Sequence, residues 1–337
     1  MRQRQNELLS QLIHTALGYW RAQVLLAANE LLVFDVLSEG PRTAQEVAAR
    51  CGSSPDYTER LLNACVATQL LKKDREHFAN LRIAESFLVK GRPGYMGNWI
   101  RLMSAWYAPW GKLSEAVREG RPVEEPIRHL GEDEDYTRDF ILAMHDYAMG
   151  PGRAIVEHAD LSGCRKLLDL GGGAGSYSIL LAQEHGELRS VVFDLPGVVE
   201  IAREVIAEHG LSERVTVQGG DYLADDVGAG YDAILLSNML HQEDRENCLA
   251  LLRKAREALV DGGTLIVQAV FLNSAKDGPV WATLQSLLLL LLYQGGRTYS
   301  LDETLELLVE AGFHDPVVER MSLLGAESII LARKGEA

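Results

Sequence analysis

The hydrophobic positions in the first part of the chain recur at intervals of three and four residues, which is the period of a helix that faces a core. Between residues 6 and 37 this spacing predicts two helices before the turn at Gly40. Thr43 and Glu46 have the spacing of a capping box, so they predict the start of a further helix, which Gly52 ends.

The next segments complete the outline of a winged helix. Residues 54–56 start another helix, and residues 70–73 and 77–80 alternate like two short strands around a polar turn. Helical spacing then continues through residues 93–160. Aromatic and methionine side chains crowd one part of this stretch, either as core residues or as the lining of a flat aromatic ligand pocket: Trp99, Met103, Trp106 and Trp110.

A winged helix can bind DNA through its second helix, so charge is informative here. The candidate recognition helix, residues 56–70, offers only Arg60 as a base, against Asp56 and Glu59. The whole chain has 33 Lys and Arg against 48 Asp and Glu, a formal net charge of −15, which repels phosphates. We therefore expect no nucleic-acid partner, and we interpret the apolar faces of residues 9–37 as a homodimer interface.

After Gly163 the pattern changes to apolar strands that alternate with helices. Strands are predicted at 166–170, 190–194, 214–218, 231–236 and 263–270, and helices at 176–184, 197–209 and 245–259. This alternation is typical of an α/β fold with a parallel sheet covered on both faces. Residues 316–323 and 327–333 are two further strand-like runs with a short connection, so they predict a hairpin that places one antiparallel strand in the sheet.

Other classes of protein are excluded by local composition. The most intense apolar run, Leu287 to Leu292, is shorter than the roughly 20 residues that cross a bilayer, so we interpret it as a buried helix and expect no membrane partner. The N-terminal stretch lacks the apolar block of a signal peptide. The four cysteines have no metal-binding spacing, which favours a reducing, cytoplasmic location and no metal.

A glycine-rich turn directly follows the first predicted parallel strand. Its sequence is Asp169-Leu-Gly171-Gly172-Gly173-Ala-Gly175-Ser176. The spacing is GxGxG, whereas the dinucleotide fingerprint is GxGxxG and the phosphate-binding loop is GxxxxGK[ST]. Asp169 at the strand end would oppose a pyrophosphate, but it would attract a cation such as the sulfonium and ammonium groups of S-adenosylmethionine (SAM).

Two more acidic residues follow the next two predicted strands. Asp194 ends the second strand, where a carboxylate can bind both hydroxyls of a ribose, and Asp221 follows the third. Because the carboxyl ends of parallel strands meet at one edge of a sheet, we expect these acids to converge with Asp169 on one cofactor site.

With these motifs the chain resembles the plant-type O-methyltransferase family, which includes caffeate-like, acetylserotonin-like and hydroxyneurosporene-like members, and in particular its bacterial branch. The resemblance covers nearly the whole chain and rests on segments in the family's order: residues 167–175, 192–196, 219–221, 236–241 and 295–300. It implies a winged-helix dimerisation domain at 1–100, a helical linker at 101–160 that contributes to a substrate pocket, and a Rossmann-like, SAM-binding methyltransferase domain at 161–337.

The resemblance also implies roles for individual residues. The expected cofactor contacts are Asp169, Gly171, Gly173 and Gly175 for the methionine portion, Asp194 for the ribose, and Asp221 and Tyr222 for the adenine side. Ser237 stands near the cofactor at a position where plant members usually have a lysine. The expected substrate contacts are Met144, His145 and Asn238.

His241 lies just past the fourth parallel strand, at the edge where open α/β folds bind ligands, and it matches the family's general base. The family often places two acids beside this histidine, and those positions fall on Ala269 and Thr298 here. Unless Glu243 or Asp244 substitutes, the imidazole loses its preferred tautomer and some basicity. Catalysis would then be slower, would need an acidic hydroxyl, or would be lost.

These observations predict a SAM-dependent O-methyltransferase that acts on a hydroxyl of an aromatic or polyene-like small molecule. Two alternatives remain open, a C-methyltransferase or repurposed, non-methylating member of the family, and a cofactor-binding regulatory protein. Trp281, Gln285 and Tyr293 suggest a large and mostly apolar acceptor, but packing alone would give the same composition.

Overall fold

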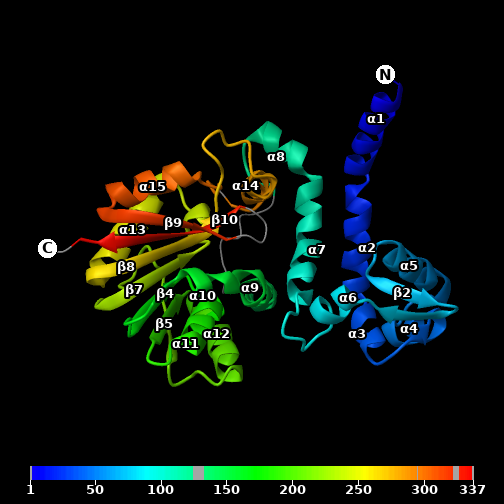
Figure 1. Cartoon of the computed structure of the whole chain (residues 1–337), viewed down its shortest axis with the longest axis horizontal. Coiled ribbons are helices and arrows are strands. Elements are labelled where there is room, and N and C mark those ends of the chain that lie inside the picture. The colour runs from blue at the N-terminus through cyan, green and yellow to red at the C-terminus, as the bar shows by residue number, and fades with distance from the viewer. Residues whose placement is uncertain (1, 124–132, 294, 322–325, 336–337) are drawn as a thin grey trace. The chain divides into compact units, whose positions relative to one another are not determined.

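The computed structural model describes residues 2–123, 133–293, 295–321 and 326–335. The chain divides into two compact units, Met1–Trp106 and Tyr107–Ala337. In Figure 1 the first unit runs from blue to cyan and the second from cyan through green and yellow to red.

The first unit contains a winged helix, as predicted. Its helices are α1 (Arg2–Ala16), α2 (Gly18–Glu30), α3 (Val33–Ser38), α4 (Ala44–Cys51), α5 (Pro55–Ala67), α6 (Arg82–Phe87) and the first part of α7 (Gly97–Gly111). A small antiparallel sheet joins β1 (Arg42–Thr43), β3 (His77–Asn80) and β2 (Leu71–Asp74) in that order. The predicted capping box starts α4, because Thr43 accepts a hydrogen bond from the Glu46 backbone while the Glu46 carboxylate accepts one from the Thr43 N–H.

The prediction of two helices between residues 6 and 37 is wrong, because the fully described chain there forms three. Leu17 separates α1 from α2 with φ −91° and ψ 1°. Leu32 separates α2 from α3 in the left-handed conformation, with φ 56°. Both breaks occur at apolar residues that keep the helical spacing, so the pattern gave no sign of them.

Helices α1 and α2 carry a row of exposed apolar side chains: Leu8, Leu9, Leu12, Ile13, Tyr19 and Trp20, between 47% and 66% exposed. A contiguous apolar surface of this kind is typical of a protein–protein interface. The candidate DNA-recognition helix, in contrast, uses its basic residue locally, since Arg60 forms a 2.9 Å ion pair with Asp56.

The second unit is built on a mostly parallel sheet, and it confirms the predicted α/β class. In the described part of the chain the strand order is β6-β5-β4-β7-β8-β10-β9. The strands are β4 (Lys166–Leu170), β5 (Arg189–Asp194), β6 (Val215–Gly219), β7 (Tyr231–Ser237), β8 (Leu259–Val270), β9 (Phe313–Arg320) and β10 (Glu327–Lys334). Strand β10 is antiparallel to both of its neighbours. Residues 322 and 323 of the predicted hairpin lie outside the described residues.

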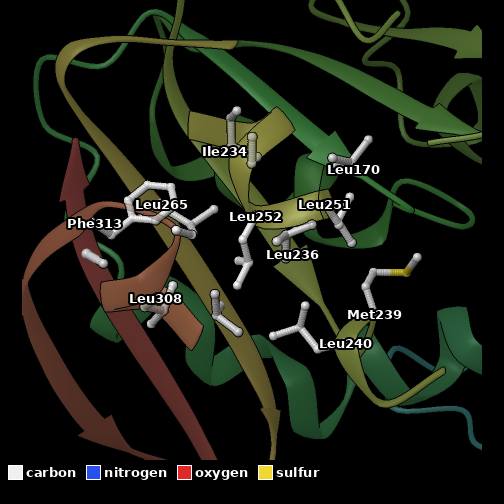
Figure 2. Packing of buried hydrophobic residues seen from close by; sticks show 14 of the residues in the cluster. Leu170, Ile234, Leu236, Met239, Leu240, Leu251, Leu252, Leu265, Leu308 and Phe313 are labelled. Carbon is white, nitrogen blue, oxygen red and sulfur yellow. The ribbon is translucent and has the colours of Figure 1, made fainter. Parts of the chain in front are cut away.

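Helices cover both faces of this sheet. The helices of the second unit after α7 are α8 (Leu113–Glu119), α9 (Glu134–Met149), α10 (Ile155–His158), α11 (Ser176–Glu184), α12 (Pro196–Glu208), α13 (Arg245–Ala258), α14 (Val280–Leu292) and α15 (Leu301–Glu310), with 3-10 turns η1 (Pro151–Ala154) and η2 (Leu240–Gln242). Figure 2 shows the core on the α13 and α15 face, where Leu236, Leu252 and Leu308 meet Leu265 and Phe313. A second core on the opposite face joins the sheet to α10 and α11.

The leucine run of α14 is a helix, as predicted, but it is not buried throughout. Leu289, Leu291 and Leu292 are buried, whereas the other three leucines of the run, Leu287, Leu288 and Leu290, are only partly buried. One side of the helix packs in the apolar cluster of Val270, Leu272, Ala282 and Ala326, and the opposite side is therefore less buried. Among the described helices, none is long and apolar enough to cross a membrane.

Candidate active site

Three acidic residues meet at one edge of the sheet, because the strands that carry them are neighbours. Asp169 is in β4, Asp194 ends β5 and Asp221 lies two residues after the end of β6. The sheet order runs β6-β5-β4. The register pairs Asp169 with Val192 and Asp194 with Gly219. The structure therefore places the three predicted cofactor acids along the same edge of the sheet, on three neighbouring strands.

The glycine turn between β4 and α11 is held against β5 by its backbone. The Gly171 N–H donates to the Phe193 carbonyl at 2.8 Å, and the Gly173 N–H donates to Asp194 Oδ2 at 2.8 Å. Gly171, Gly173 and Gly175 all have positive φ, at 73°, 56° and 73°. These angles favour glycine, because a Cβ atom is strained in the left-handed region.

Space also requires glycine in this turn. A Cβ atom on Gly171 would lie 2.3 Å from Met239 Sδ, and one on Gly172 would lie 2.7 Å from Asp169 Cγ. At Gly173 the first atom that a Cβ would meet is 3.8 Å away, so this backbone is open to a ligand. Met239 lies two residues before His241, and its contact with Gly171 therefore joins the histidine turn to the glycine turn.

Asp169 is the most deeply buried acid of the site, with none of its surface exposed. Its Oδ2 accepts a hydrogen bond from the Ser178 hydroxyl at 2.7 Å. Its Oδ1 is buried, and no described residue gives it a hydrogen bond. Burial raises the pKa of this carboxyl to about 6.

Asp194 is tied to the backbone through both oxygens, since Oδ1 accepts from the Leu195 N–H at 2.7 Å and Oδ2 from Gly173. Burial raises the pKa of Asp194 to about 6 as well. Two desolvated carboxylates at one edge of a sheet are costly without a positive charge beside them. The open Gly173 backbone and the unpaired Asp169 oxygen therefore fit a cationic ligand such as SAM and do not fit a pyrophosphate.

The two residues expected on the adenine side have different environments. Asp221 is exposed, and its Oδ1 accepts from the Leu223 N–H at 2.8 Å. Tyr222 is partly buried, and its hydroxyl donates to Glu243 Oε1 at 2.6 Å. The Tyr222 ring also packs against the sheet core, which fixes the start of the segment after β6.

A polar network at the end of β7 contains a residue that the sequence analysis missed. Gln268 of β8 is 1% exposed, and its Oε1 accepts from the Ser237 hydroxyl at 2.5 Å and from Asn238 Nδ2 at 3.1 Å. The Asn238 N–H also donates to the Gln268 carbonyl at 2.8 Å, and Asn238 has φ 56°. The single amide within the apolar run of β8 was the available signal, since a buried polar side chain needs partners.

His241 lies in η2, three residues beyond this network. Its carbonyl accepts from the Arg297 N–H at 3.0 Å. Its ring nitrogen Nδ1 is buried and has no hydrogen-bonding partner in the described ranges of the chain. Burial lowers the pKa of the imidazole to about 4, so the ring is neutral at pH 7.

The suggestion that Glu243 or Asp244 orients His241 is wrong. The Glu243 carboxylate accepts hydrogen bonds from Tyr222 and from Asn247 Nδ2, and Asp244 caps α13 by accepting from the Asn247 N–H. Both side chains are therefore committed to the start of α13, where a carboxylate is also favoured by the helix dipole.

The positions where the family often has acids hold residues of another kind. Ala269 is buried in the core between the sheet and α13. Thr298 is 4% exposed, and its hydroxyl donates to Gln285 Oε1 of α14 at 3.4 Å. The imidazole of His241 is thus held by its backbone and by packing.

The expected substrate residues Met144 and His145 lie on α9. His145 Nδ1 is 2.8 Å from the Ser176 hydroxyl, and its ring meets the His209 ring edge-on at 5.5 Å between centroids. Burial, with a smaller contribution from His209, lowers the pKa of His145 to about 4. The observed contacts of His145 are therefore with the first residue of α11, next to the glycine turn, and with His209 at the end of α12.

Within the ranges that the structure describes, no group of three or more His, Cys, Asp or Glu side chains could hold a metal ion.

Comparison with known proteins gives matches over nearly the whole chain. The profile of an O-methyltransferase domain matches residues 110–314, and that of an O-methyltransferase dimerisation domain matches residues 13–90. The 3-hydroxy-5-methyl-1-naphthoate 3-O-methyltransferase of Streptomyces sahachiroi is 34% identical over 95% of this chain and 93% of its own. The acetylserotonin O-methyltransferase of Bos taurus is 33% identical over 94% and 95%. The crystal structure of human N-acetylserotonin methyltransferase in complex with SAM superimposes with a TM-score of 0.89, 30% identity and coverage of 97% and 98%.

Proposed function

This chain belongs to the O-methyltransferase family and is a SAM-dependent methyltransferase, and we propose that it methylates a hydroxyl group of an aromatic small molecule with His241 as the general base. The observation that carries the proposal is the position of His241, on the turn that Met239 packs against the glycine turn. This contact joins the turn that carries His241 to the glycine turn, which supports a role for the neutral imidazole beside the cofactor.

The cofactor residues of the proposal are those that the fold gathers at the sheet edge. Asp169 and the backbone of Gly173 would hold the methionine portion, Asp194 the ribose, and Asp221 with Tyr222 the adenine side. Bound SAM supplies a methyl group on a positively charged sulfur. The carboxylates of Asp169, which is buried, and Asp194, which is partly buried, gain a counter-charge when that cation enters, which favours binding.

His241 acts on the acceptor as a weak base that is already free of a proton. A phenol of ordinary pKa near 10 would transfer its proton to an imidazole of pKa about 4 at a cost of roughly 8 kcal/mol if the transfer were complete before methylation. The proton therefore moves to His241 as the oxygen forms its new bond to carbon, and acidic phenols react faster. Alignment of the hydroxyl supplies much of the remaining acceleration.

The pH dependence of the reaction should distinguish the contribution of His241 to kcat from that of Asp169 and Asp194 to SAM binding. Because burial lowers the pKa of His241 to about 4, kcat at saturating SAM should hold from pH 7 down to pH 5, whereas an ordinary histidine would lose activity below pH 6.5. Asp169 and Asp194 take up protons below about pH 6, so KM for SAM should rise there. Initial rates measured from pH 4.5 to 8 check both kcat and KM for SAM, with circular dichroism as a control for folding. A fall in kcat centred on pH 6.5 would contradict the assignment.

The class of acceptor is proposed from the relatives. Their names specify a hydroxynaphthoate and acetylserotonin, both hydroxylated aromatic ring systems, and the apolar side chains of α14 are consistent with such a guest. We therefore propose a hydroxylated bicyclic aromatic in place of the polyene-like option. The C-methylating or repurposed alternative is not favoured, because the matching profile and these relatives are O-methyltransferases.

The direct test is methyl transfer from labelled SAM to a panel of naphthols and hydroxyindoles, with product identified by mass and by fragmentation. A product with the label on oxygen supports the proposal. A label on ring carbon would show C-methylation, and SAM binding by calorimetry without transfer to any member of the panel would show a non-methylating protein.

We also propose that the chain forms a homodimer through its N-terminal unit. The dimerisation profile covers residues 13–90, and burial of the exposed apolar row of α1 and α2 in an interface would be favourable. Sedimentation equilibrium should give twice the monomer mass of 37.2 kDa. The variant Leu12→Asp, at a position that is 66% exposed, should give monomers, while Asp56→Asn on the surface of α5 should not. A monomeric wild-type chain would contradict the proposal.

A further inference from the structure

Glu327, the first residue of β10, is a buried acid that the proposed reaction does not use. The side chain is 2% exposed. Its Oε1 accepts a hydrogen bond from the Tyr147 hydroxyl of α9. Its Oε2 is buried and has no partner among the residues that the structure describes. Burial raises the pKa of this carboxyl to about 7. A buried oxygen with an unmade hydrogen bond costs stability, so such an atom points to a ligand.

The sheet register places Glu327 at the edge that carries the reaction site. Glu327 pairs with Val270, the last residue of β8, and Gln268 lies two residues before Val270. Residues that pair directly, and residues two apart in one strand, face the same side of a sheet. Glu327 is therefore on the same face as Gln268, whose amide holds Ser237 and Asn238 before His241.

A second buried polar atom without a partner, a hydrogen-bond donor, belongs to a side chain that packs beside the first residue of β10. Trp281 of α14 packs against the apolar cluster of Val270, Leu272 and Ala326. Ala326 immediately precedes Glu327, and Val270 is its cross-strand partner. The indole Nε1 of Trp281 is buried and, within the described residues, donates to nothing. One apolar cluster is thus flanked by an acceptor and a donor, and both lack partners.

We propose that Glu327, held by Tyr147, and Trp281 bind a second hydroxyl group of the aromatic acceptor, remote from the oxygen that is methylated. A hydroxyl can donate to Glu327 Oε2 and accept from Trp281 Nε1 at the same time. A protonated amine suits the carboxyl alone, because it has no lone pair for the indole N–H. The inference rests on the proposed function, since it assigns the acceptor to the class of dihydroxylated aromatics.

The test is binding of three matched probes to the full-length protein loaded with S-adenosylhomocysteine. The probes are 2-naphthol, 2,7-dihydroxynaphthalene and 7-methoxy-2-naphthol, of which only the second offers a remote hydrogen-bond donor. In the wild type the diol should bind about tenfold more tightly than the methoxy compound, which corresponds to about 1.4 kcal/mol. The double variant Y147F/E327M replaces both partners with apolar groups of similar shape, and the preference should fall to less than twofold.

Two further variants separate recognition from structure. Glu327→Gln can keep the bond from Tyr147 through its one carbonyl oxygen, but it puts an amide N–H donor where Oε2 accepted, so it should reduce the preference for the diol. Glu310→Gln, at an exposed ion pair with Arg245, is the matched control and should leave the preference unchanged. A wild type without preference for the diol would overturn the inference. So would a preference that persists in Y147F/E327M, whatever its melting temperature.

Methyl transfer to the same probes is measured separately, so that the two proposals can fail independently. If the diol preference holds in binding but no probe accepts a methyl group, the proposed function fails and the hydroxyl site stands. If all three probes are methylated with equal KM in the wild type, the proposed function stands and the hydroxyl site fails.

Discussion

Replacing His241 with alanine should lower kcat by roughly 10² to 10⁴, the range that a positioned general base contributes, while SAM binding changes by less than about threefold. The reason is that His241 lies on η2, and its turn is held by backbone contacts that alanine preserves, such as that between its carbonyl and the Arg297 N–H. The measurement is single-turnover methyl transfer beside calorimetry with S-adenosylhomocysteine.

The matched control for this variant is His314→Ala, at an exposed position in β9. It should retain wild-type kcat. Equal turnover by the His241 variant would discard its role as a base, and a parallel loss of cofactor binding would assign it to the binding site instead. Recovery of activity with added imidazole in the His241 variant would support the role of the ring itself.

Replacing Asp169 with asparagine should have opposite effects on stability and on binding. Burial raises the pKa of Asp169 from about 3.8 to about 6 in the folded chain, so at pH 7 its ionised form opposes folding by roughly 3 kcal/mol. The neutral amide removes most of this cost and can still accept from Ser178. The cofactor-free variant should therefore melt several degrees higher. Its affinity for SAM should fall by about 100-fold, because the counter-charge for the cation is gone.

The sign of the pH dependence gives this prediction an internal check. A carboxyl with a raised folded pKa stabilises the fold as the pH drops through 6 towards 3.8, and it destabilises the fold above that window. The wild type should be more stable at pH 5.5 than at pH 7, and this difference in the free energy of unfolding should be smaller in Asp169→Asn. Asp261→Asn, at an exposed position in β8, is the control and should change neither quantity. An apo variant that melts below the wild type would contradict the electrostatic account.

The sheet was predictable because burial on both faces leaves a local signature. Strands β4 and β7 are mostly apolar, and every residue in them except Lys166, Asp232 and Ser237 is buried. The glycine turn was predictable for a similar reason, since its positive φ values restrict the residue type at each position. The N-terminal helices differ in this respect, because Leu32 adopts a left-handed conformation that no local rule assigns to leucine.

Polar partners across strands were not predictable. Gln268 and Ser237 meet through the parallel register of β7 and β8, and Tyr147 reaches Glu327 across 180 positions of sequence. The partner of Glu243 could not be predicted for the same reason, since its carboxylate accepts a hydrogen bond from Tyr222, which follows β6. Such pairings depend on the packing of whole elements, which periodicity does not encode.

The contact of Met239 with Gly171 limits how this protein can diversify. Because a side chain from the histidine turn fills the space beside the glycine turn, substitutions in either one disturb the other, and neither can drift alone. New acceptor preferences would have to arise at proposed acceptor contacts outside that constraint, on α14 and at the start of β10. A mutational library for altered selectivity is best concentrated there, with residues 169–175 and 237–241 kept fixed.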